Sequence, residues 1–195
     1  MRKKIIYNLA AGLLLLVNAC SNKTETSPLF DLLEPGSTGI SFSNTLKPTA
    51  DLNMLKYMYF YNGAGVGAGD LNNDGLVDLY FASNQVGDKL YLNGGDMKFR
   101  DISTDAGIPN DGGWSTGVSI VDVNNDGMLD IYVCRVGNYA SLKSHNLLLV
   151  CQSISKDGIP HYKDESVSFG LAFSGFSTQA AFADFDRMGT SICTC

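Results

Sequence analysis

The chain has 195 residues, 45% of them hydrophobic, with 14 Lys and Arg against 20 Asp and Glu and a formal net charge of -6. This length and apolar content are sufficient for one ordinary globular domain and argue against wholesale disorder. The acidic balance argues against a nucleic-acid partner, because a phosphate-binding surface needs clustered Lys and Arg. Its 21 Gly, 9 Tyr and 10 Phe favour a turn-rich β protein.

Residues 1–19 have the pattern of a signal peptide. Three basic residues follow Met1, residues 5–17 are largely apolar, and Ala19 is the small residue before Cys20. The apolar run is too short for a secure transmembrane helix. The segment resembles a bacterial lipoprotein signal, which implies cleavage before Cys20, lipidation of that cysteine, and anchoring at the outer membrane or cell surface, outside the cytoplasm. An ordinary secretory signal with an incidental cysteine is the alternative.

The next segments are expected to be a tether and then strands. Residues 20–38 are polar with scattered Pro and Gly, as in a flexible linker. Residues 40–43 alternate apolar and polar side chains, and residues 57–61 are rich in aromatic side chains. Both patterns predict β-strands.

Two nearly identical nine-residue phrases, 70–78 and 122–130, dominate the rest of the chain. Each has oxygen-bearing side chains at positions 1, 3, 5 and 9 and glycine at position 6, an arrangement that gathers oxygens around a hard cation such as calcium. Metal-free Asn-Asp-Gly hairpin turns are the alternative, but three carboxylates would repel one another in each loop without a cation. The predicted calcium ligands, which include the carbonyl at position 7, are Asp70, Asn72, Asp74, Leu76 and Asp78 in the first loop and Asp122, Asn124, Asp126, Met128 and Asp130 in the second.

An EF-hand is excluded by the residue at position 12 of each phrase. That motif needs a bidentate Glu at this position and helices on both sides. Position 12 is Phe81 in the first phrase and Val133 in the second, and both flanks have strand patterns. The aspartate at position 9 is therefore expected to close the site.

The flanks of the phrases repeat as well, so that each unit is predicted to hold four strands. The phrases begin 52 residues apart, a spacing typical of arrays of four-stranded units. The turns at 105–108 and 168–171 close the units in similar ways. The expected strands are residues 63–69, 79–82, 89–93 and 97–101 in the first unit and 115–121, 131–134, 146–150 and 161–165 in the second.

The glycine run at 63–69 formally matches a dinucleotide-binding fingerprint. That fingerprint opens a helix, whereas this run leads into the acidic loop at Asp70. Close packing of a small-residue inner strand is the preferred interpretation.

A third unit begins at residue 176 and stops. Residues 176–186 mirror the approach to the earlier phrases, so Asp184 and Asp186 are candidate ligands. Residues 188–195 then depart from the pattern, although they can be encoded by codons that, read in a shifted frame, continue the phrase. We hypothesise that a single-base frameshift produced this tail and truncated a longer chain.

The remaining chemistry-bearing residues indicate no catalytic arrangement. Cys134 and Cys151 lie in apolar runs and are expected to be buried free thiols. His145 and His161 are expected to be ordinary surface or interface histidines. Trp114 and the other aromatic residues are expected to pack between sheets, with a sugar site as the alternative. We therefore expect a protein that is not an enzyme.

The repeated acidic loop and its following strand, at 70–81 and 122–133, resemble the FG-GAP or VCBS repeats of integrin α-chain-type β-propellers. The resemblance implies an all-β fold, a partial β-propeller of four-stranded antiparallel blades across residues 39–187, with two blades and the start of a third. With the signal, the chain looks like the N-terminal part of envelope lipoproteins whose propeller precedes an ASPIC/UnbV domain. We expect a calcium-binding lipoprotein module that captures a protein or glycan ligand or serves adhesion or scaffolding. A fragment of a propeller enzyme acting on polysaccharide, or a non-functional truncation product, are the alternatives.

Overall fold

The computed structural model describes residues 28–184 and 192–194. The chain divides into two compact units, Met1–Leu33 and Glu34–Cys195. The second unit begins with a single helical turn, α2 (Pro35–Thr38), which ends at Gly39 with a left-handed φ of 80°. Within these described ranges, no helix combines the length and the apolar character needed to cross a bilayer.

The second unit is built from antiparallel sheets whose strand order follows the chain. The third sheet has two strands, β9 (Ala181–Ala183) and β10 (Ile192–Thr194). This architecture confirms the predicted all-β fold of two four-stranded blades followed by the start of another. The four-stranded sheets are β1 (Val66–Gly69), β2 (Asp78–Phe81), β3 (Lys89–Asn93) and β4 (Phe99–Asp101), then β5 (Trp114–Val121), β6 (Asp130–Val136), β7 (Leu147–Ile154) and β8 (Pro160–Asp164).

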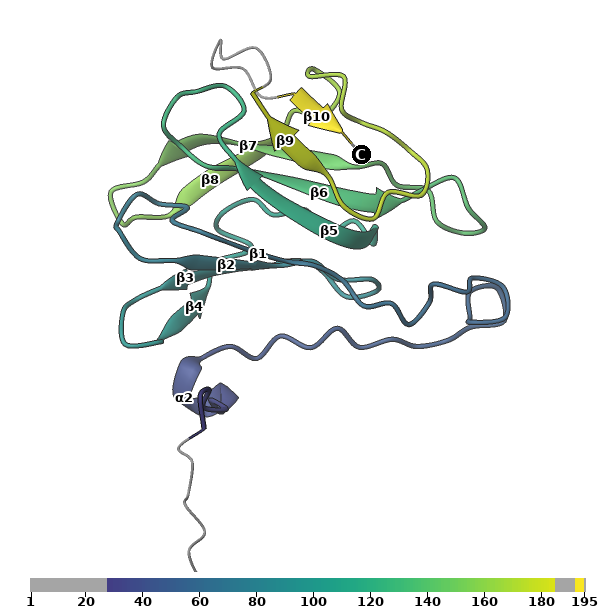
Figure 1. Cartoon of the computed structure of the whole chain (residues 1–195), viewed down its shortest axis with the longest axis horizontal. Coiled ribbons are helices and arrows are strands. Elements are labelled where there is room, and N and C mark those ends of the chain that lie inside the picture. Colours follow the sequence, from purple (N-terminus) through teal and green to yellow (C-terminus); the bar gives the residue numbers. More distant parts are fainter. Residues whose placement is uncertain (1–27, 185–191, 195) are drawn as a thin grey trace, which may run out of the picture. The chain divides into compact units, whose positions relative to one another are not determined.

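The sheets lie as successive layers, with β1–β4 on one side of β5–β8 and β9–β10 on the other (Figure 1). The main core fills the space between the first two layers and includes Tyr80, Leu90, Ile131 and Leu149. A smaller cluster on the opposite face of β5–β8 packs against residues of the third repeat, among them Ala180. Because β6 and β7 are covered on both faces, they read as continuous apolar runs rather than alternating ones.

The glycine run forms a closely packed inner strand, as predicted. A Cβ atom at Gly67 would lie 2.7 Å from Val118 Cγ1 and 2.8 Å from Ile120 Cδ1, both on β5. A side chain on this face of β1 would therefore separate the sheets. The run continues directly into the acidic loop, not into a helix.

The same strand register frames all three acidic segments. The residue before the loop pairs with the residue at position 9: Gly69 with Asp78, Val121 with Asp130, and Ala183 with Ile192. The backbone of the third repeat therefore pairs as in the first two. The side-chain chemistry at position 9 differs, because isoleucine replaces aspartate.

The predicted strands at 40–43 and 57–61 are wrong. Residues 40–43 keep an alternating pattern of burial, but they form no ladder. Phe42 stacks on Phe81 with the ring centroids 5.0 Å apart, and Asn44 exchanges hydrogen bonds with Asn84. This segment is therefore an extended strap held through side chains rather than a strand.

Residues 57–61 form turns, with the backbone N–H of Phe60 donating to the carbonyl of Tyr57. Both of these side chains are buried, together with Trp114 and Leu142. Aromatic residues favour strands because they fit a pleated, half-buried surface. Here the same burial is reached from a turn, so the local preference is overridden.

Candidate functional site: the acidic loops

The first acidic loop is closed by its own aspartate side chains. The two carboxylate oxygens of Asp70 accept hydrogen bonds from the backbone N–H groups of Asp74 and Gly75, at 3.0 and 2.8 Å. Asp74 Oδ1 accepts the N–H of Leu76 at 2.8 Å. Asn73 and Gly75 take left-handed φ values of 59° and 86°, which Asn and Gly tolerate best. The sequence at positions 1, 4, 5 and 6 thus dictates the turn.

The second loop repeats this geometry residue for residue. Asp122 accepts the N–H groups of Asp126 and Gly127 at 3.2 and 2.9 Å, and Asp126 Oδ1 accepts that of Met128 at 2.8 Å. The φ values of Asn125 and Gly127 are 58° and 82°. The two loops therefore share both their hydrogen bonds and their backbone conformation, and they form one recurring structure.

The aspartate at position 9 anchors each loop to the sheet. Asp78 has no exposed surface, and its oxygens accept the N–H groups of Leu71 at 2.9 Å and Asn93 at 2.8 Å. Asp130 is buried likewise and bonds the N–H groups of Val123 and Cys151, at 3.0 and 2.8 Å. Each carboxylate therefore ties its loop to the third strand of its own sheet.

Burial disfavours the charged form of the Asp78 and Asp130 carboxylates. The pKa of Asp78 is raised to about 6, chiefly by burial and in smaller part by the charges of Asp74 and Asp70, while the hydrogen bonds from Asn93 and Leu71 act to lower it. The pKa of Asp130 is raised by the same kinds of cause, with Asp126 and Asp122 supplying the repulsion. Each loop therefore concentrates negative charge that a cation would neutralise.

The two loops contact each other and the second blade. Asn73 Nδ2 donates to the carbonyl of Gly127 in the second loop at 3.0 Å. Asn72 Nδ2 donates to the carbonyl of Gly158, in the β7–β8 turn, at 3.1 Å. The Asn72 side-chain oxygen is thereby turned toward its own loop, where it accepts the N–H of Asp74 at 3.2 Å.

The oxygen donors of the two loops are of the kind that a hard cation binds, but their side chains do not converge on one point in this structure. Across the described ranges, no three His, Cys, Asp or Glu side chains converge closely enough to hold a metal. Calcium coordination also uses amide and backbone carbonyl oxygens, and each loop offers one Asn side chain and the position-7 carbonyls of Leu76 and Met128. Asp70, Asn72 and Asp74, with Asp122, Asn124 and Asp126, lie around their turns, while Asp78 and Asp130 lie beneath them.

The third copy has only part of this donor set. Asp184 follows β9 at position 1, and Asp186 lies outside the described residues. Position 5 is Met188 and position 9 is Ile192 in this chain. Two of the four oxygen-bearing side chains of the other loops are thus absent from the third copy.

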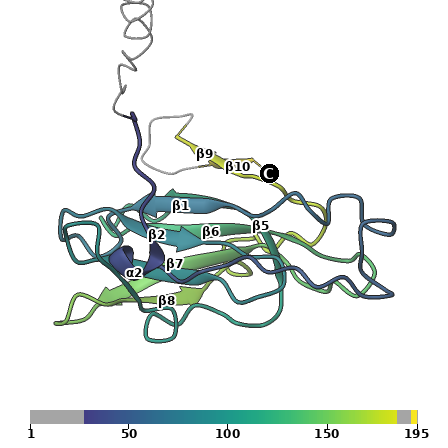
Figure 2. The same cartoon turned by 90° about the horizontal axis from the view of Figure 1, so that it is seen from below.

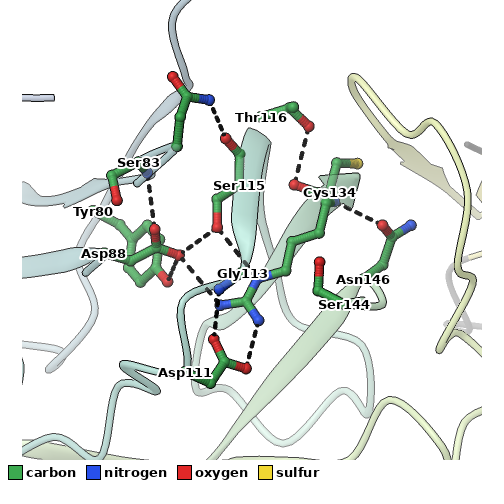
Figure 3. Close-up of polar contacts among 12 residues, drawn as sticks. Tyr80, Ser83, Asp88, Asp111, Gly113, Ser115, Thr116, Cys134, Ser144 and Asn146 are labelled. Carbon is green, nitrogen blue, oxygen red and sulfur yellow. Dashed lines mark hydrogen bonds and ion pairs between the residues drawn. The ribbon is translucent and has the colours of Figure 1, made fainter. Parts of the chain in front are cut away.

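A buried polar network that the sequence did not predict joins the first blade to the second (Figure 3). Asp88 accepts the Tyr80 hydroxyl at 2.9 Å, the Ser83 N–H at 2.8 Å and the Ser115 hydroxyl at 2.9 Å. Arg135 Nε donates to Ser115 Oγ at 3.2 Å. Burial raises the pKa of Asp88, although Arg135 and these donors act in the opposite direction.

The same arrangement recurs between the second blade and the third repeat. Asn146 takes the place of Asp88: its Nδ2 donates to Tyr132 Oη at 3.0 Å and to Ser177 Oγ at 2.9 Å, and its Oδ1 accepts the Arg135 N–H at 2.7 Å. We call each set a Tyr–Asx–Ser relay. Ser115 and Ser177 each lie seven positions before the first aspartate of the acidic phrase of their own unit. The equivalent position in the first unit is Gly63. The recurrence of Tyr and Ser at these offsets is the signal from which the relay could have been found.

The other residues singled out in the sequence have structural positions. Cys134 and Cys151 are buried, and they face different core clusters on opposite sides of the sheet, so they cannot bond to each other. His145 Nε2 lies 3.6 Å from Asp164 Oδ2, and His161 is exposed. Trp114 is buried and packs on Tyr57 and Phe60, as expected.

The comparisons with known proteins agree with this repeat architecture. Residues 57–133 match the model of the FG-GAP-like repeat. The chain is therefore similar to that repeat over this segment. It is also similar to Cartilage acidic protein 1 of Xenopus tropicalis, with 30% identity over 138 residues, which are 71% of this chain and 20% of that protein. The chain therefore spans about a fifth of the length of this curated relative.

Proposed function

We propose that the chain is a calcium-binding, extracytoplasmic lipoprotein module that captures a ligand, in adhesion or scaffolding at the cell surface. An FG-GAP-like repeat supports an integrin-like adhesion or ligand-binding module and a non-enzymatic repeat domain. The observation that carries the calcium proposal is the repeated loop geometry, in which two oxygen-rich turns share hydrogen bonds, φ values and strand register.

Calcium would have a structural role in this proposal. The ion would take its oxygens from the predicted ligands of the two loops and supply charge neutralisation between carboxylates. The attachment of the loops to the sheets does not depend on the ion, since Asp78 and Asp130 hold the loops to β3 and β7 through hydrogen bonds. Because Asn73 contacts the second loop, bracing one turn would steady its neighbour.

The lipid anchor is proposed from the sequence. Lipidation of Cys20 would hold the module at the outer membrane or cell surface, with residues 21–38 as the tether. Cys20 and residues 21–27 of that tether lie outside the described residues. An ASPIC/UnbV-type parent protein is part of the same proposal.

Thermal melts of the purified chain in calcium and in excess chelator test the calcium proposal. A ligand that binds only the folded state stabilises it by about 2.7 kcal/mol at a hundredfold excess over its Kd. For a chain of this size we expect calcium to raise the Tm by roughly 5–10 °C.

The matched variants separate coordination from net charge. Asp74→Asn with Asp126→Asn removes one carboxylate from each loop and should abolish most of the shift. Asp96→Asn with Asp105→Asn makes the same change in net charge at exposed positions outside the loops and should retain it. Identical melts of the unaltered chain with and without calcium would refute the calcium proposal.

A further inference from the structure

A cavity of about 480 Å³ lies at the far end of the inner strands from the acidic loops. Its walls come from the turns at 57–65, the start of β5 and the opening segment of the third repeat at 176–179. Four aromatic residues line it: Tyr57, Tyr59, Trp114 and Phe176. Its volume is in the range of ordinary small-molecule sites.

Two buried aromatic residues in this cavity have polar groups without a protein partner. Trp114 is 1% exposed and Tyr57 is 4% exposed. In the part of the chain that the structure describes, neither the Trp114 indole N–H nor the Tyr57 hydroxyl makes a hydrogen bond. Among the described residues, His145 Nε2 is the side-chain polar atom that is both fully buried and without a hydrogen-bond partner. The Trp114 and Tyr57 polar atoms therefore retain some accessible surface. Buried Trp and Tyr polar groups normally find partners. Both residues line the cavity, so a ligand there would supply them.

Exposed rings stand beside these donors. Tyr59 and Phe176 are 51% and 55% exposed. The Phe176 ring stacks on Tyr57 with centroids 6.3 Å apart and an interplanar angle of 28°, and Trp114 meets Tyr57 edge to face at 5.5 Å. The cavity thus offers flat apolar surface next to hydrogen-bond donors.

The remaining lining is polar, neutral and held in place. Among the residues that the structure describes, no charged side chain lines the cavity. Thr116 Oγ1 donates to the Ser177 carbonyl at 2.7 Å, and Gln179 Nε2 donates to the Val118 carbonyl at 3.1 Å. These bonds fix the wall formed by the third repeat against β5, so the cavity is preorganised.

We propose that this cavity binds a neutral saccharide unit of a glycan. The C–H face of a sugar ring packs on aromatic rings, and its hydroxyl oxygens can accept from Trp114 Nε1–H and Tyr57 Oη–H. A charged ligand would lose hydration without an opposite charge to replace it. The proposal rests on the proposed function as a ligand-binding module, and it names the ligand class and its site.

The tryptophan that lines the cavity reports on it directly, because the chain has 1 Trp. The purified chain, in calcium, would be titrated with linear trisaccharides of glucose, galactose, mannose and N-acetylglucosamine while Trp114 fluorescence is recorded. We expect at least one to give a saturable change. Phe176→Ala should weaken that sugar about tenfold or more, the loss of roughly one stacking contact. Phe173→Ala, which removes an exposed phenylalanine that does not line the cavity, should leave the affinity unchanged.

Three results would overturn the proposal. The first is no fluorescence response to any of the four trisaccharides from a chain whose melt shows that it is folded. The second is equal affinity in the Phe176→Ala variant, which would place the sugar elsewhere. The third is saturation by N-acetyltyrosinamide with no response to sugars, which would make the cavity a peptide site. The calcium melt is read separately, so failure of the calcium proposal is distinguishable from each of these.

Discussion

Arg135 is a buried cation between the first two blades, with its side chain 2% exposed. Its Nη1 lies 2.8 Å from Asp111 Oδ2, and its Nη2 lies 3.9 Å from Asp88 Oδ2. Gly113 makes room for the guanidinium, because a Cβ there would lie 2.6 Å from Arg135 Cζ. Losing one partner of a buried charge leaves the other uncompensated, so the acidic partners of Arg135 matter more than exposed ion pairs do.

At the residue scale, the Asp111–Arg135 pair predicts a pH dependence. Partial burial acts to raise the pKa of Asp111, but the hydrogen bond and charge of Arg135 outweigh it, and the pKa is lowered. A carboxyl with a lowered folded-state pKa stabilises the fold above its unfolded pKa of about 4, and this contribution is lost as the pH falls through the folded value.

We therefore expect Asp111→Asn to lower the free energy of unfolding by about 1 kcal/mol at pH 7, a modest figure because the side chain is half exposed. The difference should shrink below about pH 4. Urea unfolding of both proteins at pH 7, 5 and 3 measures it, with the exposed Asp105→Asn variant as control. A difference that stays constant across this pH range would contradict the assignment.

At the element scale, each blade joins the next through a Tyr–Asx–Ser relay and through close sheet packing. The first relay uses an aspartate beside Arg135, whereas the second uses the neutral Asn146. The Asx position keeps the same kinds of partner, but the direction of the bonds differs: Asp88 accepts from the Tyr and Ser hydroxyls, whereas Asn146 donates to them. Because a serine of each following unit completes the relay of the preceding one, the relay couples neighbouring repeats.

A double-mutant cycle tests the first relay. Tyr80→Phe and Ser115→Ala each remove a hydroxyl that donates to Asp88 Oδ2. We expect a coupling free energy of about 0.5–3 kcal/mol from urea unfolding, because the two donors share one buried acceptor. Tyr80→Phe combined with Ser168→Ala, whose exposed hydroxyl bonds Glu165, should be additive to within about 0.5 kcal/mol. Additivity in the first pair would show that the relay does not act as a unit.

The packing of β1 on β5 predicts the effect of a small change at Gly67. Gly67→Ala places a methyl group 2.7 Å from Val118 Cγ1, so the sheets must shift, and we expect a loss of about 1–3 kcal/mol. Ala68→Val adds more volume at the adjacent, exposed position of the same strand and should cost less than about 0.5 kcal/mol. Chemical denaturation compares them, and equal stabilities of the two variants would argue against close packing at Gly67.

At the scale of the whole molecule, the layered sheets place different features at opposite ends of the inner strands. Figure 2 shows the sheets from below, in a view in which the layers overlap. The acidic loops lie between the first and second strands of their blades, and the aromatic cavity lies where the inner strands begin. In the proposed function, calcium braces one end and a glycan binds at the other.

The proposed anchor gives a prediction for the whole chain. Cys20→Ser removes the thiol that lipidation requires, so the variant should move from the membrane fraction to the soluble envelope fraction of a bacterial expression host. Cys151→Ser changes a buried thiol instead and should leave the fractionation of the folded protein unchanged. Retention of the Cys20→Ser variant in membranes would count against lipidation at this residue.

Repetition made most of the fold predictable. The strand at 89–93 has its predicted bounds, and the other seven strands of the two blades lie within their predicted neighbourhoods. The turn chemistry of the acidic loops was also readable, because Asn and Gly at positions 4 and 6 meet a local requirement for positive φ. Segments 40–43 and 57–61 were misread because each pattern reports burial, and burial there comes from packing on other segments rather than from a ladder.

The sequence by itself determined the repeat, the two oxygen-rich loops and the all-β class, since these depend on residues close together in the chain. Only the tertiary structure decided that Asp88 meets Ser115 and Arg135, that Asn73 touches the second loop, and that Trp114 and Phe176 line one cavity. Those contacts join residues 27 to 62 positions apart. Which residues meet in these contacts depends on how the sheets stack. The sequence pattern of a single strand does not determine that stacking.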